Sequence, residues 1–114
     1  MTKILWFSRH VMTDDQLNAL VAKFGEVDIM QVDKTIKTAY ELADEVEACD
    51  VIAIVAPIDL QAQFVKLAKD KPVIVAQNRR ELVKSDDGSE SKAVFIFDGW
   101  KRLEKIEIVM TDFA

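Results

Sequence analysis

Glycine is scarce in this chain, and its scarcity removes the commonest nucleotide-binding loops. Only three of the 114 residues are glycine, and none lies between the first apolar run, Lys3 to Phe7, and the helix expected to begin at Thr13. Neither a G-x-G-x-x-G dinucleotide loop nor a P-loop can form at a turn without glycine. We therefore expect no dinucleotide cofactor, no flavin and no ordinary NTPase chemistry.

Cysteine and histidine are equally rare, with one residue of each, Cys49 and His10. An intrachain disulfide needs two cysteines, and a structural zinc site needs about four protein ligands, mostly nitrogen and sulfur, so both are excluded within one chain. Asp14, Asp15 and Asp59 leave a magnesium site open, although the helix dipole ordinarily explains acidic residues in a first helical turn. We expect no metal and no cofactor, and we interpret Cys49 as a small buried residue.

An excess of positive charge is also missing, as are long apolar runs. The chain has 15 Lys and Arg against 20 Asp and Glu, a formal net charge of -5. This balance does not attract duplex nucleic acid or an anionic membrane, and no apolar stretch approaches the roughly 18 residues of a spanning helix. With one cysteine and no signal-peptide pattern at the start, we expect a cytoplasmic protein.

Apolar runs alternate with amphipathic segments along most of the chain, and this alternation predicts an α/β fold. Half of the residues are hydrophobic, enough for one domain, residues 1 to 114, with a buried core. The pattern predicts strands at 3–7, 27–32, 51–55 and 73–76, and helices from Thr13 to Phe24, through Ile36 to Val46, and from Pro57 or Asp59 to Ala68. We expect a three-layer, mainly parallel Rossmann-like sheet of flavodoxin-type order 2-1-3-4.

After Gln77 the pattern becomes typical of antiparallel strands. Residues 81–84 and 92–97 flank Asp86-Asp87-Gly88, which is a hairpin turn signal, and residues 103–110 have the composition of one more strand. The parallel sheet is therefore expected to end in an antiparallel C-terminal extension.

The predicted strand order leaves one face of the sheet short of helices. Right-handed crossovers put the first helix on one face and the other two on the opposite face. Beside the first helix, strands three and four would expose apolar side chains unless the C-terminal segment or a second subunit covers them. On this basis we predict a homodimer.

Polar side chains gather where the predicted strands end, which is the ligand-binding edge of such sheets. Ser8, Arg9 and His10 follow the first strand directly and should face Pro57 across the switch point between strands one and three. The candidate ligand-binding residues are Ser8, Arg9, His10, Pro57, Gln77, Asn78 and Arg79, which Lys34, Thr35 and Arg80 could extend. Their hydroxyl, imidazole, amide and guanidinium groups suit a phosphate or carboxylate ligand. The alternative is that these are ordinary solvated loop residues.

The apolar first strand that ends in Ser8-Arg9-His10, the cap formed by Thr13 and Gln16, and the four-strand core make residues 1–80 resemble the small CRISPR-associated Rossmann-like domains. Some of those domains bind or cleave cyclic oligonucleotides. The chain is also similar to small uncharacterised proteins of phages and mobile elements. The first resemblance implies a dimer with a ligand pocket across its two-fold axis and a setting in phage defence. The chain departs from that family in its shorter helical complement and in its antiparallel end.

Two functions from different classes follow. Metal-independent cleavage of a phosphodiester needs a base, a cation for the phosphorane and an acid. His10 could be the base and Arg9 or Arg79 the cation, so His10 and Arg9 are the candidate catalytic residues of a nucleotide-binding phosphodiesterase. The alternative is a non-enzymatic protein-interaction module, such as a phage-type inhibitor or an accessory subunit, whose acidic surface binds a basic partner. Whether the protein is an enzyme stays open.

Overall fold

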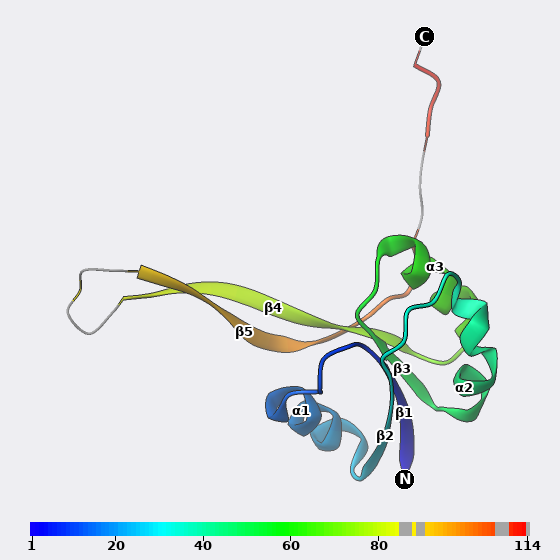
Figure 1. Cartoon of the computed structure of the whole chain (residues 1–114), viewed down its shortest axis with the longest axis horizontal. Helices are drawn as coiled ribbons and strands as arrows, with labels where there is room; N and C mark the ends of the chain where they lie inside the picture. Colours follow the sequence, from blue (N-terminus) through cyan, green and yellow to red (C-terminus); the bar gives the residue numbers. More distant parts are fainter. Residues whose placement is uncertain (85–87, 89–90, 107–109, 114) are drawn as a thin grey trace.

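The computed structural model describes residues 1–84, 88, 91–106 and 110–113, and within them the strands form one mainly parallel sheet (Figure 1). The order is β2-β1-β3-β4-β5, so the expected 2-1-3-4 order with an antiparallel extension is confirmed. The strands are β1 (Thr2–Phe7), β2 (Val27–Val32), β3 (Val51–Ile54), β4 (Val73–Lys84) and β5 (Ser91–Arg102). The helices are α1 (Asp14–Phe24), the short 3-10 helix η1 (Ala39–Leu42), α2 (Ala43–Ala48) and α3 (Ile58–Ala68).

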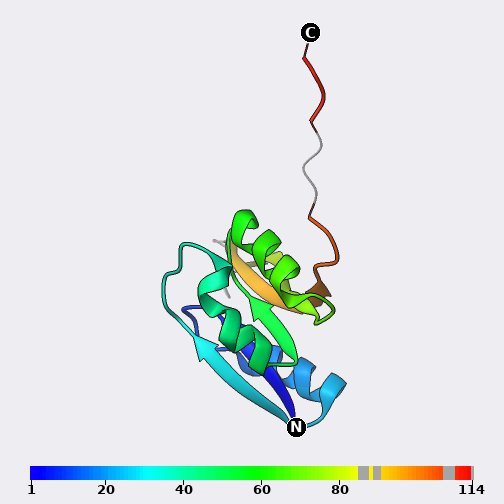
Figure 2. The same cartoon turned by 90° about the vertical axis from the view of Figure 1, so that its right-hand side faces the viewer.

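Alternation along β1 divides the core between the two faces of the sheet. Leu5 and Phe7 belong to the cluster under η1, α2 and α3, whereas Ile4 and Trp6 belong to the cluster under α1. Figure 2 shows α2 and α3 on one side of the sheet and α1 on the other. Every residue of β3 is buried, as expected of a central parallel strand covered on both faces. Cys49 is buried too, as predicted.

The helix predicted from Ile36 to Val46 was wrong at its start, because the first turn of this segment is not helical. The chain becomes helical only at Ala39, and α2 then continues to Ala48. The Glu41 carboxylate accepts hydrogen bonds from the backbone N–H groups of Lys37 (2.7 Å) and Thr38 (3.0 Å). These donors are satisfied outside a helix, which leaves residues 33–38 as a loop beside the end of β2.

The two antiparallel strands are longer and differently bounded than predicted. β4 does not stop at Ala76 but continues to Lys84. Ala76 pairs with Trp100 and Asn78 pairs with Phe97, so β5 contains one extra residue in this stretch, which forms a β-bulge. The extra residue of this bulge falls near Gly99, whose φ of 109 lies in the region that favours glycine. Of the predicted turn, Asp86 and Asp87 lie outside the described residues.

The strand predicted at 103–110 is wrong for its described residues, 103–106 and 110. The N–H of Leu103 donates to the carbonyl of Val73 (2.8 Å), which is the first residue of β4. β4 offers no further residue for pairing beyond that point, so the ladder ends. Residues 107–109 lie outside the described part of the chain.

The face beside α1 is covered by the chain's own C-terminal half. Trp100 of β5 packs against Trp6 with ring centroids 5.9 Å apart, and its Nε1 donates to the carbonyl of Gln16 at the start of α1 (3.1 Å). Val51 and Ile74 are accordingly buried on that face. The uncovered face on which a second subunit was predicted is therefore absent here, and the homodimer itself stays a prediction. Among the helices described, none is long and apolar enough to cross a membrane.

Candidate functional site

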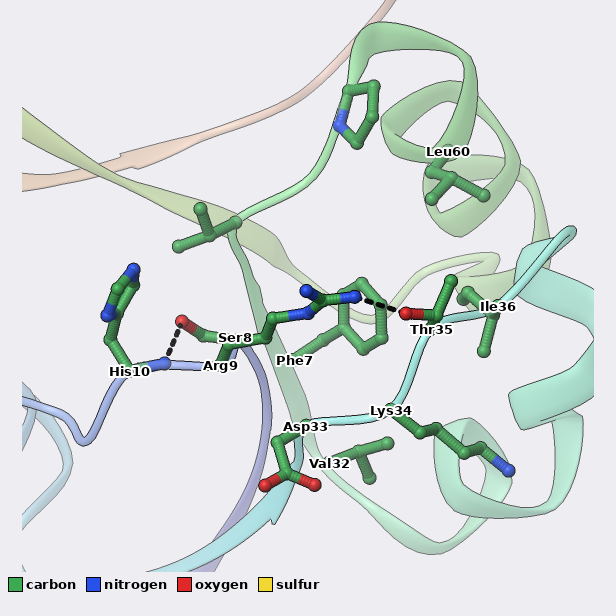
Figure 3. A pocket seen from close by; sticks show the side chains of 12 residues that line it. Phe7, Ser8, Arg9, His10, Val32, Asp33, Lys34, Thr35, Ile36 and Leu60 are labelled. Carbon is green, nitrogen blue, oxygen red and sulfur yellow. Dashed lines mark hydrogen bonds between the residues drawn. The ribbon is translucent and has the colours of Figure 1, made fainter.

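Two adjacent cavities open at the carboxyl ends of the parallel strands. The first has a volume of about 360 Å³ and lies between the loops that follow β1, β2 and β3 (Figure 3). The second, of about 420 Å³, lies between the loop after β1, the start of α1 and β4. Ser8, His10 and Val55 line both cavities and separate them. This is the predicted switch point between strands one and three.

The loop that begins at Ser8 is held by side chains of the neighbouring strands. The indole Nε1 of Trp6 donates to the carbonyl of His10 (2.9 Å), and Gln31 Nε2 donates to the carbonyls of Ser8 (2.9 Å) and His10 (3.0 Å). The Ser8 hydroxyl oxygen is almost buried and accepts from the His10 N–H (3.1 Å), which leaves its own proton free to donate. Sequence reasoning missed Gln31, whose only signal is a polar residue one step before the end of β2.

Arg9 spans the first cavity and reaches the loop after β2. Its Nη2 donates to the hydroxyl oxygen of Thr35, as the dashed line in Figure 3 shows. Lys34 and Asp33 line the same cavity, whereas its walls are apolar and include Phe7. Arg9 therefore places a guanidinium, a group that orients a charged ligand, in a mainly apolar pocket. Figure 3 shows the charged ends of Lys34 and Asp33 directed away from this guanidinium.

The start of α3 adds a further feature to the first cavity. Its N-cap residue is Pro57, which lines the cavity and makes no side-chain capping hydrogen bond. By contrast, Thr13 and Gln16 form a complete capping box at the start of α1, as predicted. Pro57 thus supplies no side-chain acceptor for the first N–H groups of α3, and such groups favour an anion.

The predicted site residues separate into three groups in the structure. Ser8, Arg9, His10 and Pro57 line the first cavity, and Asn78 joins Ser8 and His10 around the second. Gln77 and Arg79 line neither cavity, because β4 continues past Ala76 and carries them outward as strand residues. Arg79 instead pairs with Glu81 and lies 3.9 Å from Asp98. Lys34 and Thr35, weighed only as an extension, also line the first cavity, and Thr35 accepts from Arg9.

The two candidate catalytic side chains point in different directions. In Figure 3 the Arg9 guanidinium reaches toward Thr35, and the His10 imidazole extends away from both. His10 thus stands at the boundary with the second cavity rather than beside the guanidinium. The arrangement is suited to holding a charged group at Arg9, with His10 available to a ligand that continues toward the second cavity.

Two titratable groups have a shifted pKa, Glu41 near the loop after β2 and the buried Cys49. Hydrogen bonds from the backbone of Thr38 and then Lys37 lower the pKa of Glu41 from its usual 4.5. This stabilisation of the loop after β2 is present above pH 4.5 and is lost as the pH falls through the lowered value. Burial raises the pKa of the Cys49 thiol. Within residues 1–84, 88, 91–106 and 110–113, no three His, Cys, Asp or Glu side chains gather to hold a metal ion.

Fold and site together define a Rossmann-like α/β protein with a cation-lined cavity at the switch point of its sheet. Comparisons with protein-family models, with curated proteins and with solved structures give no match to this chain. Function must therefore be argued from the geometry of the cavity itself.

Proposed function

We propose that this protein binds a small anionic ligand, a nucleotide or a related phosphate compound, in the first cavity. The observation that carries the proposal is that the Arg9 guanidinium spans a cavity of about 360 Å³, which Lys34 and Pro57, the N-cap of α3, also line. That volume falls within the usual range of ligand pockets, about 300–1,000 Å³. A guanidinium binds phosphate through paired, charge-assisted hydrogen bonds, so we assign the phosphate to Arg9.

Asp33 makes a nucleotide a better fit than free phosphate. Its carboxylate lines the same cavity and would repel an anion, but it accepts hydrogen bonds from sugar hydroxyls and from base N–H groups. The apolar side chains of Phe7, Ile36 and Leu60 offer the remaining wall a base or sugar can pack against. The ligand would thus have its phosphate at Arg9 and its uncharged part toward Asp33.

The same proposal includes cleavage of a cyclic or linear oligonucleotide without a metal, in the cytoplasm and in a phage-defence setting. His10 would take the 2′-hydroxyl proton, the 2′-oxygen would attack phosphorus, and the bond from phosphorus to the 5′-oxygen would break to give a 2′,3′-cyclic phosphate. Arg9 would stabilise the phosphorane, and a lysine, a water or the partner's His10 would protonate the leaving 5′-oxygen. Support comes from the position of His10 between the two cavities, where a ligand longer than a mononucleotide would reach it. A homodimer belongs to the proposal as well.

A protein-interaction module is the second candidate function, because one feature favours it. β4 and β5 extend beyond the rest of the sheet and expose Leu82 and Phe95 to 69% and 75%. Exposed apolar side chains of this size on one strand pair mark a contact surface.

Calorimetric titration tests the binding site with inorganic phosphate, a mononucleotide, and linear and cyclic oligonucleotides. We expect nucleotide binding by the wild type and a loss of about 10- to 100-fold in affinity in Arg9→Gln and in Lys34→Gln, because each removes a charged hydrogen-bond donor worth about 1.5–3 kcal/mol. Lys66→Gln, an exposed change on α3, is the matched control and should bind like the wild type. Absence of binding by every probe, or full affinity in Arg9→Gln, would overturn the proposal.

Mass analysis of the bound oligonucleotide after incubation tests turnover separately from binding. We expect shortened product with the wild type and none with His10→Ala, because the imidazole is the chain's one histidine base. His10→Ala should retain binding, since the phosphate is assigned to Arg9. An intact ligand with the wild type would leave a binding protein without turnover, and equal product with His10→Ala would exclude His10 as the base.

A further inference from the structure

β4 and β5 continue as an isolated two-stranded ribbon, residues 79–84 paired with residues 91–96. Figure 1 shows it projecting beyond α1 and away from the other strands. It leaves the sheet at the carboxyl edge, the same edge at which the two cavities open. Two strands without a packed face are at best marginally stable in water.

One face of the ribbon combines exposed apolar side chains with the basic Arg80 and Lys84. Leu82 pairs with Ala93, and Arg80 pairs with Phe95. Residues directly opposite in an antiparallel pair point to the same face, as do alternate residues of one strand. Leu82, Ala93 and Phe95 therefore share a face, and all three are exposed. A covering surface would remove this apolar area from water.

The chain is less compact and exposes more surface than a typical folded monomer of its length. The Cα radius of gyration is 17.1 Å, whereas a compact chain of this length has about 13 Å. The accessible surface is 8373 Å², against about 6,300 Å² for a folded monomer of this mass. Residues 110–113 contribute to the excess together with the ribbon.

A matching apolar surface lies on the carboxyl edge of the sheet. Val11, Val55 and Ile58 are exposed there to 81%, 54% and 65%. Val11 and Val55 also line the second cavity, so the patch surrounds its mouth. The ribbon projects away from this edge in its own chain, and so it can reach the patch only on another copy.

Charge favours the same contact. The strands of the ribbon carry four basic residues, Arg79, Arg80, Lys84 and Lys92, against the single acidic Glu81. Residues 1–76 carry eight basic residues against twelve acidic ones. Three further acidic residues, Asp86, Asp87 and Glu90, lie between the two strands in the sequence and outside the described residues. The strands of one ribbon and the body of another copy thus have opposite charge.

We propose that the ribbon of each copy lies across the carboxyl edge of a second copy, with Phe95 and Leu82 against Val11, Val55 and Ile58. The exchange is reciprocal, so it forms a closed dimer and no larger assembly. The contact covers the exposed apolar side chains of the ribbon. It also places the partner's strands over the opening of the second cavity. This contact does not depend on the anion proposed for the first cavity.

Size-exclusion chromatography with light scattering tests the contact without any ligand present. We expect the wild type to be a dimer at about 10 µM, and Phe95→Glu and Ile58→Glu each to raise the dissociation constant about 100-fold or more, because both bury a charge at the centre of the contact. Val21→Glu introduces the same charge at an exposed apolar residue of α1 and should stay dimeric. Far-UV circular dichroism should be unchanged in all three variants, since each residue is exposed in the single chain.

Two results would overturn this proposal. A monomeric wild type at about 100 µM would contradict this contact and, with it, the homodimer of the proposed function. A dimer that persists in Ile58→Glu but not in Phe95→Glu would place the ribbon elsewhere on the second copy. If Phe95→Glu aggregates, Phe95→Ser provides the same comparison without a new charge. Because no anion is present, either failure leaves the proposed ligand site untouched.

Discussion

Replacement of Phe64 by alanine should lower the free energy of unfolding by about 3–5 kcal/mol, because it empties the centre of the larger core cluster. Phe64 is fully buried on α3, and its ring centroid lies 5.4 Å from that of Phe7, which lines the first cavity. The substitution removes apolar contact and leaves a hole between α3 and the sheet. Urea unfolding followed by circular dichroism measures the loss.

Phe113→Ala is the matched control for this prediction. Phe113 is completely exposed, so the same chemical change should alter stability by less than about 0.5 kcal/mol. If Phe64→Ala does not fold, Phe64→Leu should fold at a cost of about 1–2 kcal/mol, since it keeps most of the buried volume. Equal losses in Phe64→Ala and Phe113→Ala would contradict the packing described for α3.

Replacement of Trp6 by alanine should cost about 3–5 kcal/mol as well, and it should also loosen the candidate site. Trp6 is buried under α1, packs edge to face on Trp100, and donates to the carbonyl of His10. A single side chain thus joins the core to the loop that carries Arg9. Urea unfolding gives the stability loss, and titration with a nucleotide should show weaker binding in the same variant.

Trp6→Phe separates the two roles of this residue. It keeps an aromatic ring in the core but removes the hydrogen bond to His10, which then has only Gln31 as a donor, so we expect a smaller loss of about 1–2 kcal/mol. Amide hydrogen exchange at His10 should be faster in Trp6→Phe and unchanged in Trp100→Phe, which loses its hydrogen bond to Gln16 instead. Unchanged exchange at His10 in Trp6→Phe would exclude a role of the indole in holding the loop.

Much of the fold could be predicted because its signals are local. A continuous apolar run at Val51 indicated a central strand, and the spacing of Thr13 and Gln16 indicated the start of α1. The largest errors in the predicted strand boundaries occurred where pairing with a distant segment of the chain determines how far a strand extends. β4 was expected to end at Ala76, yet pairing with β5 continues it to Lys84, and Gly99 was the one visible sign of the bulge between them.

The candidate site was predicted only in part for the same reason. Its location at the end of β1 follows from the order of strands, which depends on apolar patterning along the chain. The hydrogen bond from Arg9 to Thr35 joins residues 26 positions apart in the sequence, and the hydrogen bond from Gln31 to the carbonyl of His10 joins residues 21 positions apart. Neither contact could be read from local sequence patterns. Arg79 illustrates the opposite error, because it follows an expected strand end but lies on the ribbon.

The sequence by itself determined the alternation of strands and helices, the absence of a glycine phosphate loop, and the position of Ser8-Arg9-His10 after the first strand. Tertiary structure alone decided which polar groups share a cavity, that Trp100 covers the face beside α1, and that a ribbon stands free at the carboxyl edge. The physical reason is the distance along the sequence between the residues that interact. Helical and strand periodicity is local, since it depends on residues a few positions apart, whereas cavities, covered faces and projecting strands depend on pairing between residues far apart in the chain.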